Sequence, residues 1–85
     1  MRSPRSIRPT SALAKSIDFT QDMMNVQLMD GRVIGVPIAW FPRLLAATPK
    51  QRKKYEIGGG GNGLHWPELD EDLSVAGLLA GADRS

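Results

Sequence analysis

The chain contains 85 residues, of which 41% are hydrophobic and 24% are charged, and its formal net charge is +2. This length fits one small domain, whose apolar side chains are needed for its own core and leave little for a deep substrate cavity. The sequence has no cysteine and one histidine, which excludes disulfides, cysteine nucleophiles and thiolate zinc sites, together with any multi-histidine metal centre within one chain.

The N-terminal segment differs in composition from the rest of the chain. Residues 1–15 hold isolated apolar side chains and several basic residues without any acidic one, the basic residues being Arg2, Arg5, Arg8 and Lys15. Because such a segment buries too little surface to offset the entropy of ordering, we predict a disordered basic arm over residues 1–15. The folded domain is then expected over residues 16–81, followed by a C-terminal tail over residues 82–85.

Apolar and polar residues alternate from Ser16 onward, and this period of two predicts three β-strands. The apolar residues of the successive strands are Ile17 and Phe19, then Met24, Val26 and Leu28, then Ile34, Val36 and Ile38. We expect the second and third sets to share the core face of an antiparallel sheet.

The connection at Asp30-Gly31 decides whether these sets can share one face. A two-residue turn would send the apolar residues of the third strand to the opposite face. A three-residue loop with Gly31 in the left-handed conformation instead places Val26 opposite Ile34 and Met24 opposite Val36. The sequence therefore predicts a bulged hairpin at Asp30-Gly31.

Two helix starts are indicated in the middle of the chain. Pro42 fits the first turn of a helix, where a missing amide proton has no consequence, and a short turn to Ala47 follows. Thr48 and Pro49 are typical of an N-cap and a first helical position, which predicts a second short helix over residues 49–55.

A third helix is expected near the C-terminus. Ser74 can cap a helix over Val75–Ala80, and Gly81 can end it. With the strands, these helices predict an α+β domain in which a small antiparallel sheet of three to four strands packs with two to three short helices.

The glycine-rich stretch over residues 58–63 is the most unusual local composition. A phosphate-binding loop requires a closing Lys-Ser or Lys-Thr and a following helix, and neither follows here. We interpret the stretch as a flexible connector.

A histidine lies close in sequence to several carboxylates. The segment comprises His65, Trp66, Pro67, Glu68, Asp70, Glu71 and Asp72. Two uses of these residues stay open: a histidine held by a carboxylate can act as a general base, and carboxylates can bind a hard cation. The structural alternative, which we favour, is a hydrogen-bonded histidine that organises a loop, with Trp66-Pro67 as a packed corner and Asp72 near a helix N-terminus.

Candidate interaction residues lie elsewhere on the predicted domain. A basic surface is expected from Arg43, Lys50, Arg52, Lys53 and Lys54. It can contact phosphates or an acidic protein, although solubilising charge is the simplest interpretation. Met23 and Met29 fall on the less apolar face of the hairpin and are candidate anchors for a partner. Trp40 and Phe41 are expected to serve the core rather than an exposed platform.

Several blocks of the sequence resemble one bacterial family, catalogued as domain of unknown function 2442. The blocks are Asp30-Gly31-Arg32, Val36-Pro37, Trp40-Phe41-Pro42-Arg43-Leu44, Ala47-Thr48, Gln51-Arg52, His65 to Ser74 and Gly77-Leu78-Leu79. The resemblance covers residues 17–81 and implies a small α+β domain without established catalytic residues. It also implies a regulatory role, because members are often encoded beside a small toxin-like protein.

The leading functional expectation is a protein-interaction or regulatory module, an antitoxin-like partner of a toxin-like protein, with no cofactor. The alternatives are nonspecific nucleic-acid binding through the basic arm and residues 49–55, and a small enzyme centred on His65 and the nearby acids. No apolar run approaches the roughly 20 residues that a membrane span requires, so we expect a cytoplasmic protein.

Overall fold

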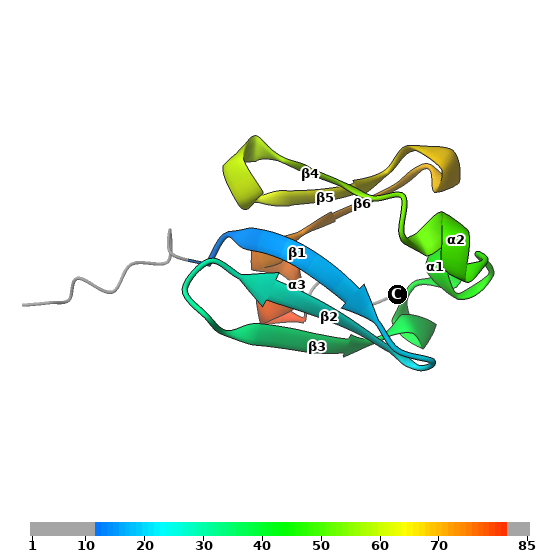
Figure 1. The fold of residues 1–85 in the computed structure, drawn as a ribbon, viewed down its shortest axis with the longest axis horizontal. Helices are drawn as coiled ribbons and strands as arrows, with labels where there is room; N and C mark the ends of the chain where they lie inside the picture. Colours follow the sequence, from blue (N-terminus) through cyan, green and yellow to red (C-terminus); the bar gives the residue numbers. More distant parts are fainter. Residues whose placement is uncertain (1–11, 82–85) are drawn as a thin grey trace, which may run out of the picture.

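The computed structural model describes residues 12–81, which form two antiparallel sheets of three strands, ordered β1-β2-β3 and β4-β5-β6 (Figure 1). The strands are β1 (Ala14–Phe19), β2 (Met23–Leu28), β3 (Val33–Pro37), β4 (Glu56–Gly58), β5 (Gly63–Trp66) and β6 (Glu71–Ser74). The helices are α1 (Pro42–Leu45), α2 (Pro49–Arg52) and α3 (Val75–Ala80), with single 3-10 turns η3 (Ile38–Trp40), η4 (Gly59–Gly61) and η5 (Pro67–Leu69). The predicted α+β class is confirmed.

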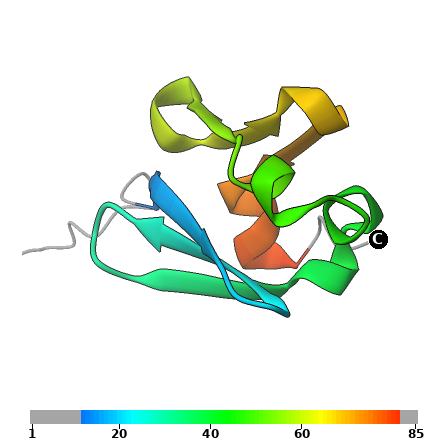
Figure 2. The ribbon, with the colours of Figure 1, turned by 45° about the vertical axis from the view of Figure 1, so that its right-hand side comes forward.

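The two sheets and α3 enclose the core between them. Figures 1 and 2 show the β4-β5-β6 sheet above the β1-β2-β3 sheet, with α3 beside the inner side of the first sheet and with α1 and α2 at the end where β3 finishes. The largest fully buried side chains come from both sheets and from the helical segments: Trp66, Phe41, Met24, Ile38, Leu44, Leu64, Val26 and Val75. The expectation that Phe41 serves the core is confirmed, and Trp40 packs partly buried against it.

The predicted bulged hairpin between β2 and β3 is confirmed. Val26 pairs with Ile34 and Met24 pairs with Val36. Gly31 has a φ of 97°, in the region that favours glycine. The N–H of Leu28 donates to the Arg32 carbonyl over 2.8 Å and closes a three-residue loop.

Two local hydrogen bonds hold this loop. The Asp30 carboxylate accepts from the backbone N–H of Arg32 over 3.0 Å and from its Nε over 2.7 Å. The backbone bond is the main cause that holds the pKa of Asp30 below its ordinary value. The loop therefore favours the ionised carboxylate.

The boundary predicted at residue 15 lies too late in the chain. β1 begins at Ala14, whose side chain is 1% exposed, because an irregularity between Ala14 and Ser16 lets Ala14 pair with Leu28. Residues 1–11 of the predicted arm and residues 82–85 of the predicted tail lie outside the described residues.

The predicted starts of α1 and α2 are confirmed, but the basic helix is shorter than expected. Pro42 opens α1, and Thr48 caps α2 in a capping box with Gln51. α2 ends at Arg52 rather than at residue 55, because Tyr55 turns inward. The Tyr55 ring packs 6.4 Å from the Trp66 ring, and this packing directs the chain into the core.

α3 follows the sequence-based expectation. The Ser74 Oγ accepts from the Gly77 N–H over 2.9 Å, and Gly81 ends the helix with a φ of 73°. Leu73 before the cap and Leu78 within the helix are both buried in the same cluster. None of the helices within residues 12–81 has the length and apolar character that a membrane crossing would need.

The second sheet is the main departure from the sequence-based expectation. The interpretation of residues 58–63 as a flexible connector is wrong in part, because Gly58 pairs with Gly63 in a β4-β5 hairpin that turns through η4. Gly59, Gly60 and Gly61 all have positive φ angles. Glycine allows this reversal where other residues would be strained, so the stretch builds a tight turn instead of a loose link.

Two hydrogen bonds join parts of the chain that are far apart in sequence. The Trp66 Nε1–H donates to the Arg52 carbonyl over 2.9 Å. The backbone N–H of Ile17 donates to the Tyr55 hydroxyl over 3.0 Å, which covers the outer edge of β1. These bonds connect β5 to α2 and β1 to the segment before β4.

The buried turn at Gly61 gives a first prediction. A Cβ at Gly61 would lie 2.7 Å from the Leu13 Cβ, whereas a Cβ at Gly60 would meet nothing within 4 Å. We expect Gly61→Ala to lower the free energy of unfolding by about 2 to 3 kcal/mol, because backbone strain and steric overlap add. Gly60→Ala has strain alone and should lose about 1 kcal/mol. Urea unfolding measures both, and equal losses would contradict this account of the turn.

The Tyr55 hydroxyl gives a second prediction. Tyr55→Phe keeps the ring but leaves the Ile17 N–H without its acceptor, so the free energy of unfolding should fall by about 1 kcal/mol. The amide of Ile17 should also exchange with solvent faster, which hydrogen exchange followed by NMR measures residue by residue. An unchanged exchange rate at Ile17 would show that this bond does not form in solution.

Candidate functional site

The register of the second sheet places three titratable side chains in one row. His65 pairs with Glu56 of β4 and with Asp72 of β6. Residues paired across antiparallel strands share a face. Leu64 and Trp66, which flank His65 in β5, are buried in the core. The row therefore lies on the outer face of the sheet.

His65 and Asp72 form a hydrogen-bonded pair at the surface. The Nδ1 of His65 lies 2.6 Å from the Asp72 Oδ1, and the two side chains are 42% and 74% exposed. Because an ionised carboxylate only accepts, it favours the proton on Nδ1 and leaves Nε2 of the neutral ring as an acceptor. Asp72 thus fixes both the orientation and the tautomer of the imidazole.

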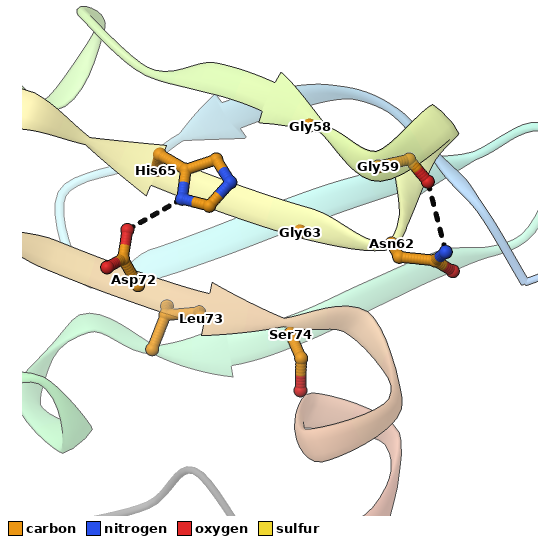
Figure 3. Close-up of a pocket in the computed structure, with 8 residues that line it drawn as sticks. All are labelled: Gly58, Gly59, Asn62, Gly63, His65, Asp72, Leu73 and Ser74. Atoms are coloured by element: carbon orange, nitrogen blue, oxygen red, sulfur yellow. Dashed lines mark hydrogen bonds and ion pairs between the residues drawn. The ribbon is translucent and has the colours of Figure 1, made fainter.

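Two glycines lie against the Nε2 edge of the imidazole. A Cβ at Gly58 would lie 2.8 Å from the His65 Nε2, and a Cβ at Gly63 would lie 3.1 Å from it. Figure 3 shows the ring of His65 directed over this pair, with Asp72 on the side of Nδ1. The ring can occupy this position only because neither neighbour carries a side chain.

These residues line an open hollow of about 540 Å³ on the outer face of the second sheet. Its lining comprises Gly58, Gly59, Asn62, Gly63, His65, Asp72, Leu73 and Ser74. The Nδ2 of Asn62 donates to the Gly59 carbonyl over 3.0 Å, which braces the turn at one end of the hollow.

The hollow provides hydrogen-bond acceptors rather than a nucleophile paired with a base. Among its lining residues Ser74 carries the hydroxyl, and its Oγ accepts from the Gly77 N–H as the cap of α3. Figure 3 shows the Ser74 hydroxyl pointing away from His65. No group of three or more histidine or carboxylate side chains within residues 12–81 is placed to hold a metal ion.

The structure divides the acidic segment among separate partners. Arg43 of α1 donates to the Asp70 carbonyl and lies 3.9 Å from the carboxylates of both Asp70 and Glu71. Asp70 is left-handed, with a φ of 53°, and ends the turn that Pro67 begins. Asp72 alone of these acids joins His65. The structure therefore does not bring His65 together with all of these acids.

Three of the five predicted basic residues are engaged in contacts inside the molecule. Arg52 donates to the carbonyls of Leu44 and Leu45 over 2.8 and 3.1 Å, and so caps the end of α1. Lys54 pairs with Glu68 over 3.0 Å. Together with Arg43, these account for three of the five predicted basic residues.

Lys50 and Lys53 are exposed, and neither has an ion pair within the part of the chain that is described. Lys53 lines a smaller hollow of about 370 Å³ between α2 and the turn after β1. The basic side chains that make no contact inside this part of the chain are thus two separate lysines, and not a continuous basic helix.

The methionine candidates lie on and beside the outer face of the first sheet. Met23 pairs with Pro37 on this face and is partly buried. Met29 lies in the loop between β2 and β3 and is 60% exposed. Val33 at the start of β3 is 53% exposed, and sequence reasoning did not single it out. The alternation after the bulged loop was the signal that could have placed Val33 on this face.

Sequence reasoning also missed Glu56, Asn62 and the paired glycines, Gly58 and Gly63, beside His65. In the sequence these residues alternate with predicted core residues, and this alternation places them on the outer face. The pairing of β4 with β5 was needed to bring them to His65. Period-two alternation does not specify which strands become neighbours.

Comparisons with known proteins place the chain in one family. The family model described as "Protein of unknown function (DUF2442)" matches residues 14–84. No curated protein matches the chain.

Two solved structures are similar to it. A crystal structure of a protein of unknown function from Rhodospirillum rubrum has 33% sequence identity and a TM-score of 0.74, over 86% of this chain and 90% of that one. A solution NMR structure of an uncharacterized protein from Chromobacterium violaceum has 27% identity and a TM-score of 0.73, over 86% of this chain and 69% of that one. The chain therefore belongs to the DUF2442 family of proteins of unknown function.

Proposed function

We propose that the protein is a protein-binding module that adds an extended segment of its partner to the free edge of β3. The observation that carries the proposal is the position of β3, which is the last strand of its sheet within residues 12–81 (Figure 1). Addition of a strand to an exposed sheet edge is a recurring mode of peptide recognition, in which backbone hydrogen bonds supply affinity.

Only every second residue of β3 bonds to β2. In an antiparallel pair, residues that exchange both backbone bonds alternate with residues whose N–H and C=O point the other way. The bond that closes the hairpin fixes the phase of this alternation. Ile34 and Val36 therefore bond to β2, whereas the backbone groups of Val33 and Gly35 face the free edge.

The two edges of the first sheet differ in this respect. On β1, the outward N–H of Ile17 is bonded to the Tyr55 hydroxyl. On β3, Val33 and Gly35 are both exposed. Pro37 at the end of the strand has no N–H, so it limits the length of any added strand. The free segment is thus short, which restricts uncontrolled association between edges.

Exposed apolar side chains lie at this edge and in the loop before it. Val33 at the edge and Met29 in the loop are two of the four large hydrophobic residues that are exposed within residues 12–81. The Met29 N–H donates to the Leu13 carbonyl, so its backbone lies toward β1. Among the paired residues of β1 and β2 that point to the outer face, Asp18 carries the charged side chain. Its carboxylate accepts a hydrogen bond from the Gln27 Nε2 over 2.7 Å. Interface centres are depleted in charge and enriched in methionine, so the composition suits a protein partner.

The role we propose for this contact is regulatory, and the toxin-like protein implied by the family resemblance is the first partner to test. Binding through β3 would act by covering a surface of that protein, in the manner of an antitoxin. Nonspecific binding of nucleic acid has weaker support, because Arg43, Arg52 and Lys54 are engaged within the molecule. Lys50 and Lys53 are then the residues whose charge attracts an acidic partner.

Hydrogen exchange and one pair of variants test this proposal on the chain co-expressed with the product of its neighbouring gene. The Val33 and Gly35 amides should exchange at least about 10-fold faster than those of Ile34 and Val36 in the free chain, and should become protected in the complex. Val33→Pro removes an outward N–H that β2 does not use, and we expect it to weaken binding at least about 10-fold, or about 1.4 kcal/mol.

Val33→Thr is the matched control, since it keeps the N–H and the branched shape, and it should weaken binding by less than about 3-fold. Isothermal titration calorimetry gives the affinities, and thermal unfolding checks that both variants fold. A folded Val33→Pro variant that binds as tightly as the parent chain would reject strand addition. Failure of the two proteins to associate at micromolar concentration would reject the regulatory partnership.

A further inference from the structure

We propose that the partner segment added to β3 places a large apolar side chain between β3 and α3, against Ile34 and Leu79. This inference rests on the proposed addition of a strand to the edge of β3, and it names the chemical character of the segment that is added. The side-chain contact is distinct from the backbone bonds of that strand, so the two can be tested separately.

Ile34 lies on the core face of β3 but is not fully buried. Its partner Val26 in β2 and its neighbour Val36 in β3 are both buried, whereas Ile34 packs only partly buried on the core. β3 is the last strand of its sheet within residues 12–81, so no strand covers the outer side of Ile34 there. In an added antiparallel strand, the residue opposite Ile34 shares its face and covers this side.

α3 is the second element beside this edge. It contacts β3, and Figures 1 and 2 show its C-terminal end, drawn in red, next to β3. Val75 and Leu78 of α3 are buried in the core, whereas Leu79 near that end is 48% exposed. Of the four large hydrophobic residues exposed within residues 12–81, Val33 and Leu79 thus belong to the two elements that meet here.

α3 carries no polar side chain. Its sequence over Val75–Ala80 is VAGLLA, and Ala76, Leu79 and Ala80 are all exposed. A helix that is apolar on every side is normally buried, since a surface helix turns charged or polar residues to solvent. The exposed side of α3 therefore has the composition of a surface that another chain covers.

The occupant must combine an extended backbone with an apolar side chain. The outward N–H and C=O groups of Val33 and Gly35 require the backbone of a strand. Because consecutive residues of a strand point to opposite faces, the residues that bond to Val33 and Gly35 point outward, and the residue between them points toward α3. Residues 82–85, which follow α3 in the sequence, contain no large apolar side chain to supply this group.

Binding of two capped peptides to the full chain tests this contact by two-dimensional NMR. The leucine peptide is Ac-Thr-Thr-Leu-Thr-Thr-NH2, and the serine peptide has serine in place of the central leucine. Threonine favours the extended conformation in both. The Val33 and Gly35 amides should shift with both peptides. The leucine peptide should bind at least about 10-fold more tightly, with saturation in the millimolar range, because only its central side chain buries apolar surface.

Leu79→Ser and Leu45→Ser form a matched pair of variants. Leu45 is 54% exposed, close to the value for Leu79, but it lies on α1 beyond the end of β3. Leu79→Ser should reduce the preference for the leucine peptide to less than about 3-fold, and Leu45→Ser should leave the preference unchanged. In the parent chain, nuclear Overhauser effects should connect the leucine methyl groups of the peptide to those of Ile34 and Leu79. Thermal unfolding checks that both variants fold.

Three outcomes would overturn the inference. Equal affinity of the two peptides, with the Val33 and Gly35 amides shifted by both, removes the apolar contact and leaves strand addition intact. An unchanged preference in a folded Leu79→Ser variant places the leucine elsewhere. Absence of any shift at these amides with either peptide also rejects the inference, whereas protection of the same amides in the complex with the neighbouring gene product tests the proposed function by itself.

Sedimentation velocity of the chain alone tests a second copy as the competing occupant. We expect a monomer at micromolar concentration, because the free segment of β3 before Pro37 is short. A dimer that Leu79→Ser dissociates would assign this surface to a second copy of the chain and would reject the partner segment as its occupant.

Discussion

The alternation of side chains along β5 is the constraint on which both the core and the candidate site depend. Leu64 and Trp66 point inward and are fully buried, while Gly63 and His65 point outward. Because consecutive residues of a strand face opposite sides, burial of the Trp66 indole forces His65 onto the surface row with Glu56 and Asp72. A shift of one residue in this strand would exchange the core and the site, so the register is strongly determined by hydrophobic burial.

Charge in this protein is used mainly to hold segments together. Arg43 connects α1 to the acidic turn after β5, and Arg52 satisfies the last carbonyls of α1. Exposed ion pairs of this kind contribute little each, at most about 1 kcal/mol, but the hydrogen bonds to backbone carbonyls also fix geometry. The segregated charge of the sequence thus becomes internal compensation across the fold, and two faces remain for interaction.

Those two faces differ in chemistry. The free edge of β3 offers backbone donors and acceptors beside the exposed Val33, which suits an extended segment of a protein. The hollow beside His65 presents an imidazole that Asp72 holds at Nδ1 and whose Nε2 edge lies against Gly58 and Gly63.

Local sequence determined the elements whose cause is local. The position of Gly31, the caps at Thr48 and Ser74, and the apolar sets of β2 and β3 were predictable because turn conformations, caps and strand faces depend on neighbouring residues. Membership of the family was predictable for a related reason, since its motif blocks are contiguous in sequence.

Only the tertiary structure decided how distant segments meet. The glycine run became a hairpin because Gly61 packs against Leu13, and the basic helix ended early because Tyr55 reaches Ile17 and Trp66. The site exists because β5 lies between β4 and β6, which brings Glu56, His65 and Asp72 together. Strand pairing and core packing are interactions between residues far apart in the chain, so local patterns restrict them without selecting the partners.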